Sequence, residues 1–352
     1  MRQHTPTLLL ALLGVGFVVY AVSAGPLNPP AGPISSTEKP LSDVEPRTIL
    51  RGSDLPITIT EPGSYLLAED VPATENAVVA ITVDSDHVTI DLGGNVLRQN
   101  DANFRQFLGG VRINENREHV TIRNGVIRGC AQDGIEALNG STVRLEGVTC
   151  ANNGANGATL DASSAAYDCL FDNNFARGLD AGNDCVVARC IAKDNGGRGF
   201  SVGNTCTLTA CTSSGNETYG YVSGRGCVFE RCTASSTTGI PGNGFFVGAH
   251  SAVTACVARS NTVGFETSTT GGVSYRDSSA AQNTTTGFSL ANGSTATGCA
   301  SRDNDGSGFA AGNGSTLESC AASINGNDGI ATGVTCKHRG CTADNNRRDY
   351  AP

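Results

Sequence analysis

A glycine followed by an apolar residue recurs along more than half of the chain. Successive glycines lie 20 to 24 residues apart, and five of the nine intervals are 21 residues. A unit of this length cannot bury an apolar face alone, so units repeated at such a period stack on their neighbours as a solenoid. The pairs are Gly134-Ile135, Gly157-Ala158, Gly178-Leu179, Gly199-Phe200, Gly220-Tyr221, Gly244-Phe245, Gly264-Phe265, Gly287-Phe288, Gly308-Phe309 and Gly329-Ile330.

Two more residue types hold fixed places within the repeat. The cysteine column, 12 residues after the glycine, comprises Cys169, Cys190, Cys211, Cys232, Cys256, Cys299, Cys320 and Cys341, with Val148 and Ser278 in the corresponding places of two longer units. The asparagine column, five residues further on, comprises Asn153, Asn174, Asn195, Asn216, Asn261, Asn283, Asn304, Asn325 and Asn346, and only Thr237 interrupts it. Alternating apolar positions, such as Phe200 and Val202, predict three short strands per coil. A leucine-rich repeat is disfavoured, because the unit has no leucine consensus.

The composition indicates an all-β chain. Glycine occurs 45 times, methionine once and tryptophan never, which is typical of short strands joined by many turns. The segment His87–Gly93 reappears as His119–Gly125, 32 residues later, so the solenoid begins before the regular units. We predict an all-β, single-stranded parallel β-helix solenoid of about ten to twelve coils of about 22 residues each.

These residues resemble the secreted bacterial right-handed parallel β-helix repeat proteins, whose fold is related to that of pectate lyases. The resemblance runs from about Ile57 to the end of the chain. Its most specific parts are the segment Ile57–Tyr65, the segment Val88–Leu92 and the recurring turns from asparagine to glycine. The resemblance implies a right-handed coil, a pectin-lyase-like fold and an exported protein.

The first residues indicate export. Arg2, an apolar stretch from Leu8 to Val19 and the small residues ending at Ala24 predict a signal peptide over residues 1–24, and the alternative is an uncleaved membrane anchor. Residues 25–48 form a proline-rich linker, and residues 49–352 form the β-helix, with a cap and irregular coils over 49–130 and regular coils over 131–352. We therefore expect a secreted or periplasmic protein with no membrane association after cleavage. The net charge of −9 disfavours nucleic acid as a partner.

The cysteine and asparagine columns have structural explanations. Cys185, Cys206, Cys227 and Cys336 lie five residues before members of the cysteine column. We expect mostly unpaired buried thiols, with disulfides within or between coils as the alternative, because an exported protein can form them. The Cys-x4-Cys spacing disfavours zinc. The asparagines are expected to form an internal ladder at a turn, a place where asparagine tolerates left-handed backbone.

Ligand-binding candidates lie on outward positions. The aromatic column Phe200, Tyr221, Phe245, Phe265, Phe288 and Phe309 follows the glycine and is expected inside the core. Phe246 must then point outward, and Tyr219, Phe246 and Glu266 are the binding candidates. We expect neither a cofactor nor a bound metal; the acidic turn Asp303-Asn304-Asp305-Gly306 keeps Ca²⁺ open, although Gly314 stands where an EF-hand needs glutamate.

Glu136 and Asp180 are the catalytic candidates. They lie two coils apart on the outward position, hence about 9.6 Å by strand spacing, near the separation of carboxylates in inverting glycosidases. The catalytic motifs of polygalacturonases and uronan epimerases are missing, and the tryptophan of the pectate lyase motif is absent. Non-catalytic binding of a glycan or another cell-surface component is the leading hypothesis. The alternative is a polysaccharide lyase or glycoside hydrolase, so enzymatic activity stays open. A copper-site protein is disfavoured by one Met and five His.

Overall fold

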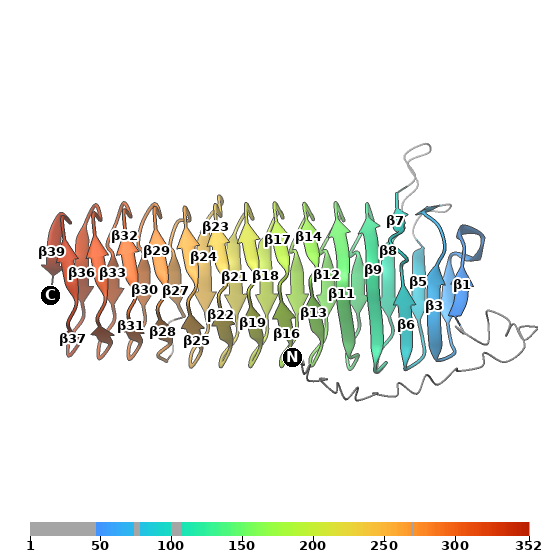
Figure 1. The fold of residues 1–352 in the computed structure, drawn as a ribbon, viewed down its shortest axis with the longest axis horizontal. Helices are drawn as coiled ribbons and strands as arrows, with labels where there is room; N and C mark the ends of the chain where they lie inside the picture. The colour runs from blue at the N-terminus through green and yellow to red at the C-terminus, as the bar shows by residue number, and fades with distance from the viewer. Residues whose placement is uncertain (1–46, 74–77, 100–106, 269–270, 352) are drawn as a thin grey trace, which may run out of the picture. The chain divides into compact units, whose positions relative to one another are not determined.

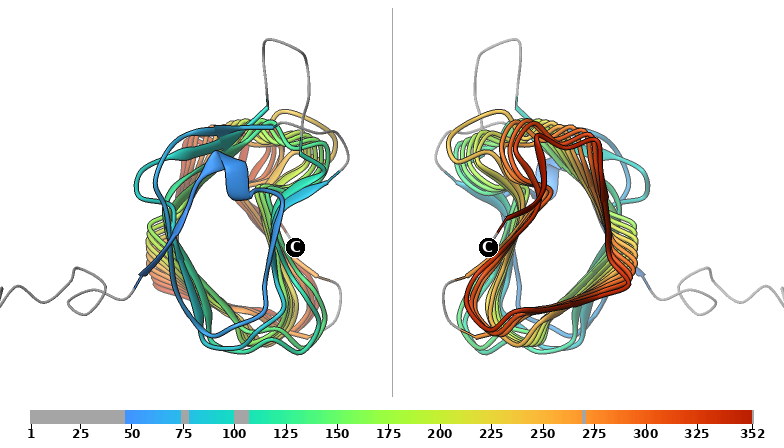
Figure 2. Two further views of the ribbon diagram at one scale, coloured as in Figure 1. Left: turned by 90° about the vertical axis from the view of Figure 1, so that its right-hand side faces the viewer. Right: turned by 90° about the vertical axis from the view of Figure 1, so that its left-hand side faces the viewer.

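A computed structural model describes residues 47–73, 78–99, 107–268 and 271–351, and the predicted signal peptide lies outside them. The chain winds into coils that stack along one axis, and successive coils superimpose when seen along it (Figures 1 and 2). Every strand pairing is parallel. The only helix among the described residues is the short 3-10 helix η1 (Gly52–Asp54). No helix there is long and apolar enough to span a membrane.

Each coil contributes strands to three faces, as the sequence predicts. Face 1 consists of β2 (Ile57–Ile59), β5 (Val79–Val83), β8 (Gly109–Ile113), β10 (Ile135–Ala137), β12 (Ala158–Leu160), β15 (Leu179–Ala181), β18 (Arg198–Val202), β21 (Tyr219–Ser223), β24 (Asn243–Val247), β27 (Phe265–Thr267), β30 (Phe288–Leu290), β33 (Phe309–Ala311), β36 (Asp328–Thr332) and β39 (Arg348–Ala351). Its fourteen strands among the described residues exceed the expected ten to twelve coils, because three precede Gly134 and one follows the last repeat glycine.

The other two faces join into one 25-stranded sheet. Face 2 consists of β1 (Arg47–Leu50), β3 (Gly63–Leu67), β6 (Val88–Asp91), β13 (Ala165–Tyr167), β16 (Val186–Ala188), β19 (Thr207–Thr209), β22 (Val228–Glu230), β25 (Ala252–Thr254), β28 (Ser274–Arg276), β31 (Thr295–Thr297), β34 (Thr316–Glu318) and β37 (Lys337–Arg339). Face 3 consists of β4 (Val71–Pro72), β7 (Val96–Arg98), β14 (Leu170–Asp172), β17 (Ile191–Lys193), β20 (Thr212–Ser214), β23 (Thr233–Ser235), β26 (Val257–Arg259), β29 (Ser279–Ala281), β32 (Ala300–Arg302), β35 (Ala321–Ser323) and β38 (Thr342–Asp344). The longer strands β9 (Val120–Arg128) and β11 (Val143–Ala151) belong to both faces and connect them.

The aromatic column forms the centre of the core. Its members pair in register on neighbouring strands of face 1, and all are fully buried. Ring centroids lie 4.6 Å apart between Tyr221 and Phe245 and 4.8 Å apart between Phe245 and Phe265, with nearly parallel planes. These separations match the strand spacing of about 4.8 Å, so the backbone repeat itself sets the stack.

The corners of each coil require left-handed backbone. In one coil the residues Asp184, Arg189 and Asp194 have φ of 56°, 54° and 55°, one at each corner. Asn195 follows the last of them and its side chain is buried. The left-handed residue is therefore the one before each column asparagine and not the asparagine itself. The asparagine instead satisfies the backbone groups that the corner leaves unpaired.

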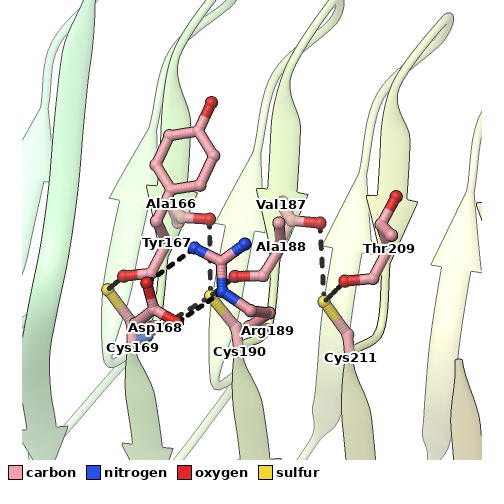
Figure 3. Close-up of polar contacts among 10 residues, drawn as sticks. All are labelled: Ala166, Tyr167, Asp168, Cys169, Val187, Ala188, Arg189, Cys190, Thr209 and Cys211. Carbon is pink, nitrogen blue, oxygen red and sulfur yellow. Dashed lines mark hydrogen bonds and ion pairs between the residues drawn. The ribbon is translucent and has the colours of Figure 1, made fainter. Parts of the chain in front are cut away.

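All fourteen cysteines are unpaired, and twelve are buried. The Cys190 thiol donates hydrogen bonds to the carbonyl oxygens of Ala166 and Ala188, each at 3.4 Å (Figure 3). Ser278, in the equivalent place of a longer unit, donates to the carbonyl of Arg276 at 2.9 Å. Serine can therefore replace cysteine as a small donor at this corner, which accounts for the column by hydrogen bonding and packing.

Candidate binding surface on face 1

Two columns of side chains cover the outer side of face 1. One is the predicted column two residues after each glycine. The other is the residue immediately before the glycine, where the sequence singled out only Tyr219 as a candidate. The two columns meet: Asn156 donates to Thr159 at 3.0 Å, and Arg198 donates to Ser201 at 3.2 Å. The chain bends at the glycine, where a Cβ on Gly244 would lie 2.7 Å from the carbonyl oxygen of the next repeat glycine.

The catalytic candidates lie where the spacing predicts, but each has its own cationic partner. Register places Glu136 beside Thr159 and Thr159 beside Asp180, so the two carboxylates are two coils apart on one face. Glu136 accepts a hydrogen bond from Arg112 Nε at 2.8 Å, and Asp180 pairs with Arg177. Both carboxylates therefore form ion pairs with arginine, and their catalytic role stays a prediction.

Asp133 lies beside this pair, in the column immediately before the repeat glycine. It accepts hydrogen bonds from the Thr159 hydroxyl and from the backbone N–H of Asn156. Burial raises the pKa of Asp133, and the negative charge of Glu136 adds to the rise, while the bonds from Thr159 and Asn156 oppose it. The sequence signal for Asp133 was its place next to a repeat glycine.

The three binding candidates come together on face 1. The rings of Tyr219 and Phe246 meet edge to face with centroids 5.8 Å apart. Phe246 pairs in register with Glu266, and the side-chain amide of Asn243 donates to the Glu266 carboxylate. The guanidinium of Arg198 lies 5.7 Å from the centre of the Tyr219 ring. We call Arg198, Tyr219, Asn243, Phe246 and Glu266 the Tyr219 cluster.

Burial dominates the electrostatics of this cluster. Burial raises the pKa of the Glu266 carboxyl group. It also raises the pKa of Tyr219, with a contribution from the Glu266 charge and opposition from Arg198. Asn243 is only 3% exposed, and its Oδ1 has no hydrogen-bond partner within the described part of the chain. An unpaired buried acceptor is destabilising by about 1 to 3 kcal/mol, and the burial of this oxygen keeps it out of reach of a ligand.

The acidic turn considered for Ca²⁺ offers fewer ligands than its sequence suggests. Asn304 points into the asparagine ladder, where its Oδ1 accepts from the backbone and side-chain nitrogens of Asn283 at 3.0 and 2.8 Å. Asp303 and Asp305 remain exposed. Over residues 47–73, 78–99, 107–268 and 271–351, no group of three or more His, Cys, Asp or Glu side chains could hold a metal ion.

The architecture defines a class of protein. The family model described as a right-handed β-helix region matches residues 73–234. Together with the three parallel strands per coil, this match defines a right-handed parallel β-helix fold. A search of curated protein sequences finds no significant match.

Solved structures resemble the chain at low identity. The A-module of mannuronan C-5 epimerase AlgE4 from Azotobacter vinelandii is 14% identical, with a TM-score of 0.45 over 82% of this chain and 88% of that one. Pectate lyase Pel9A is 15% identical, with a TM-score of 0.39 over 81% and 69%. Tailspike gp49 of Acinetobacter baumannii bacteriophage Fri1, a capsular polysaccharide depolymerase, is 12% identical, with a TM-score of 0.41 over 84% and 64%. Likeness at this level says nothing about activity.

Proposed function

We propose that the protein binds an extracellular glycan through the Tyr219 cluster and does not turn it over. The observation that carries this proposal is the pairing of two half-buried aromatic rings with polar groups on one outward surface. An aromatic ring offers an apolar face to the C–H groups of a sugar, while nearby polar groups fix the sugar hydroxyls. Arg198 and Glu266 supply those polar groups, and the Asn243 amide donates a hydrogen bond to the Glu266 carboxylate.

The proposal places the protein outside the cytoplasm, where such glycans occur. Its support is the apolar stretch Leu8–Val19 and the small residues ending at Ala24. A cell-surface component is the partner in this setting. The net charge of −9 disfavours polyanionic partners over the molecule as a whole.

The test is a glycan array probed with labelled protein and two variants, Tyr219→Ala and Phe246→Ala. Tyr167→Ala is the matched control, because Tyr167 on face 2 also lies under an arginine, with Arg144 at 4.3 Å from its ring centre. We expect retention of at least one glycan and a tenfold or greater loss of affinity in both cluster variants, equivalent to about 1.4 kcal/mol each. Retention that is equal in Tyr219→Ala and the parent protein would contradict the assignment.

A polysaccharide lyase or hydrolase is the second candidate, and one feature favours it. The pKa of Glu266 is raised by burial, which suits a group that must hold a proton for general acid catalysis. Release of reducing ends or unsaturated uronates from the retained glycans, abolished by Glu266→Gln, would establish this candidate. Loss of turnover in Glu136→Gln and Asp180→Asn instead would assign the chemistry to that pair.

A further inference from the structure

The column that follows the buried asparagines contains one exposed aromatic ring. In successive coils this column holds Gly154, Phe175, Gly196 and Glu217. Phe175 is 79% exposed, against 48% for Tyr350, the next most exposed Phe or Tyr side chain among the described residues. The fold does not require an aromatic ring here, because glycine occupies the equivalent position in the coil before Phe175 and in the coil after it. A large apolar side chain left in water contributes nothing to the core.

The two glycines leave the ring uncovered by side chains. Hydrogen bonds from Phe175 N to Asn153 O and from Gly196 N to Asn174 O, both 2.9 Å, keep these corners in register. A Cβ on Gly154 would lie 2.3 Å from the Ala131 carbonyl oxygen, and one on Gly196 would lie 2.3 Å from the Phe175 carbonyl oxygen. Neither corner can therefore carry a side chain over the Phe175 ring.

A depression of about 560 Å³ surrounds the ring and is lined by polar groups. Asn173 donates to Asn152 at 2.6 Å, and Asp194 and Glu217 complete the polar lining. Neither carboxylate has a hydrogen bond or ion pair through its oxygens within residues 107–268 or the other described ranges. In contrast, the carboxylates of Glu136 and Asp180 on face 1 are each paired with an arginine. Free carboxylates with no lining cation accept hydrogen bonds from sugar hydroxyls and repel anions.

Residues of the depression and residues of the Tyr219 cluster lie close together in sequence. Glu217 lies two residues before Tyr219, and Phe175 lies two residues before Arg177 of face 1. Phe175 and Tyr219 are therefore two coils and two residues apart, which corresponds to roughly 12 Å between their backbone positions. A ligand chain of several sugars can reach across this distance.

We infer that the depression around Phe175 is a second sugar subsite, and that the ligand is a neutral, hydroxyl-rich polysaccharide that continues from the Tyr219 cluster. The inference rests on the proposed glycan-binding function and adds the charge and minimum length of the ligand. The ring of Phe175 stacks on one sugar, and Asp194 and Glu217 accept hydrogen bonds from its hydroxyls. A polyanion is excluded because these two charges would repel it.

The test uses oligosaccharides of two and six units made of β-1,4-linked glucose, mannose or xylose. Calorimetry compares the full-length protein with Phe175→Ala, Tyr219→Ala and the control Tyr167→Ala. We expect at least one six-unit sugar to bind tenfold or more tightly than its two-unit form. Phe175→Ala should remove that gain and leave affinity for the two-unit form unchanged. The variant should fold normally, because the ring is exposed.

The outcomes separate this inference from the proposed function. Tyr219→Ala should weaken both lengths, whereas Tyr167→Ala should weaken neither. A length-dependent gain that survives in Phe175→Ala overturns the second subsite and leaves the Tyr219 cluster in place. Absence of binding to all of these sugars, or tighter binding of a glucosamine or galacturonate hexamer, overturns the assignment of a neutral ligand.

Discussion

Replacement of Asn195 by alanine should destabilise the solenoid more than any exposed substitution. Its side chain is 1% exposed and makes four hydrogen bonds inside the coil. Its Nδ2 donates to Phe171 O at 3.1 Å and to Asn216 Oδ1 at 2.8 Å. Its Oδ1 accepts from the backbone and side-chain nitrogens of Asn174, both at 3.0 Å. Asn195→Ala removes all four without altering the left-handed residue before it.

The expected loss of unfolding free energy is about 3 kcal/mol. A buried hydrogen bond contributes about 1 kcal/mol net, so the four hydrogen bonds together contribute about 4 kcal/mol. Two partner groups keep another bond: Asn174 Nδ2 still donates to Cys150 O, and Asn216 Oδ1 still accepts from the backbone of residue 195. The backbone N–H of Asn174 loses its side-chain acceptor and accounts for much of the remaining effect.

The measurement combines denaturant unfolding with hydrogen exchange, because long repeat arrays can unfold in parts. Exchange of the segment containing the Asn174 amide should accelerate by about 100-fold, the equivalent of about 3 kcal/mol. Asn327→Ala is the control, since its side chain makes no hydrogen bond within the described residues. A loss below about 1 kcal/mol at Asn195, or an equal loss at Asn327, would refute the claim that the ladder stabilises the corner.

Two further predictions concern titration and thiol access. Because burial raises the pKa of Glu266, the folded chain holds this proton more tightly than the unfolded chain, and stability falls as pH rises above the ordinary glutamate range. Glu266→Gln should therefore be more stable than the parent at pH 7 and equal to it below about pH 4, as read from denaturation midpoints; a difference independent of pH would contradict this. Iodoacetamide should label the partly exposed Cys336 and Cys341 in the native protein, as mass spectrometry can show. The buried thiols, including Cys130, whose pKa burial raises to about 12, should react only after unfolding, and native labelling of Cys130 would contradict the assigned burial.

The coil and its inward residues could be predicted because the backbone period sets both. A strand alternates its side chains, so one glycine column sufficed to place Phe245 inside and Phe246 outside. The same rule failed for the residues before the glycine, of which only Tyr219 was expected to point outward. Alternation predicts that Asn243 points the same way as Phe245, but the chain bends at the intervening glycine and turns the amide toward Glu266.

Corner residues were harder to place, because a turn has no side-chain alternation. The sequence showed that asparagine recurs at one corner, yet not which neighbour takes the left-handed conformation. Phe175 gave no periodic signal at all, since it differs from the glycines in its own column. Its significance comes from exposure, which depends on the two neighbouring coils and so requires the assembled stack.

The positions of the aromatic residues that break the repeat pattern argue for a binding site. The repeating columns are explained by stacking, and Ser278 replaces cysteine while keeping a hydrogen bond from its side chain to a backbone carbonyl. On face 1 and the corner before it, three aromatic residues fit no such explanation: Phe175 stands in a column of small and polar residues, and Tyr219 and Phe246 stand in outward columns that are otherwise mostly polar or small. Face 1 has fourteen strands among the described residues, yet these three exceptions fall within four successive coils. Random drift would scatter them along the stack, whereas contact with one extended ligand places them together on adjoining surfaces.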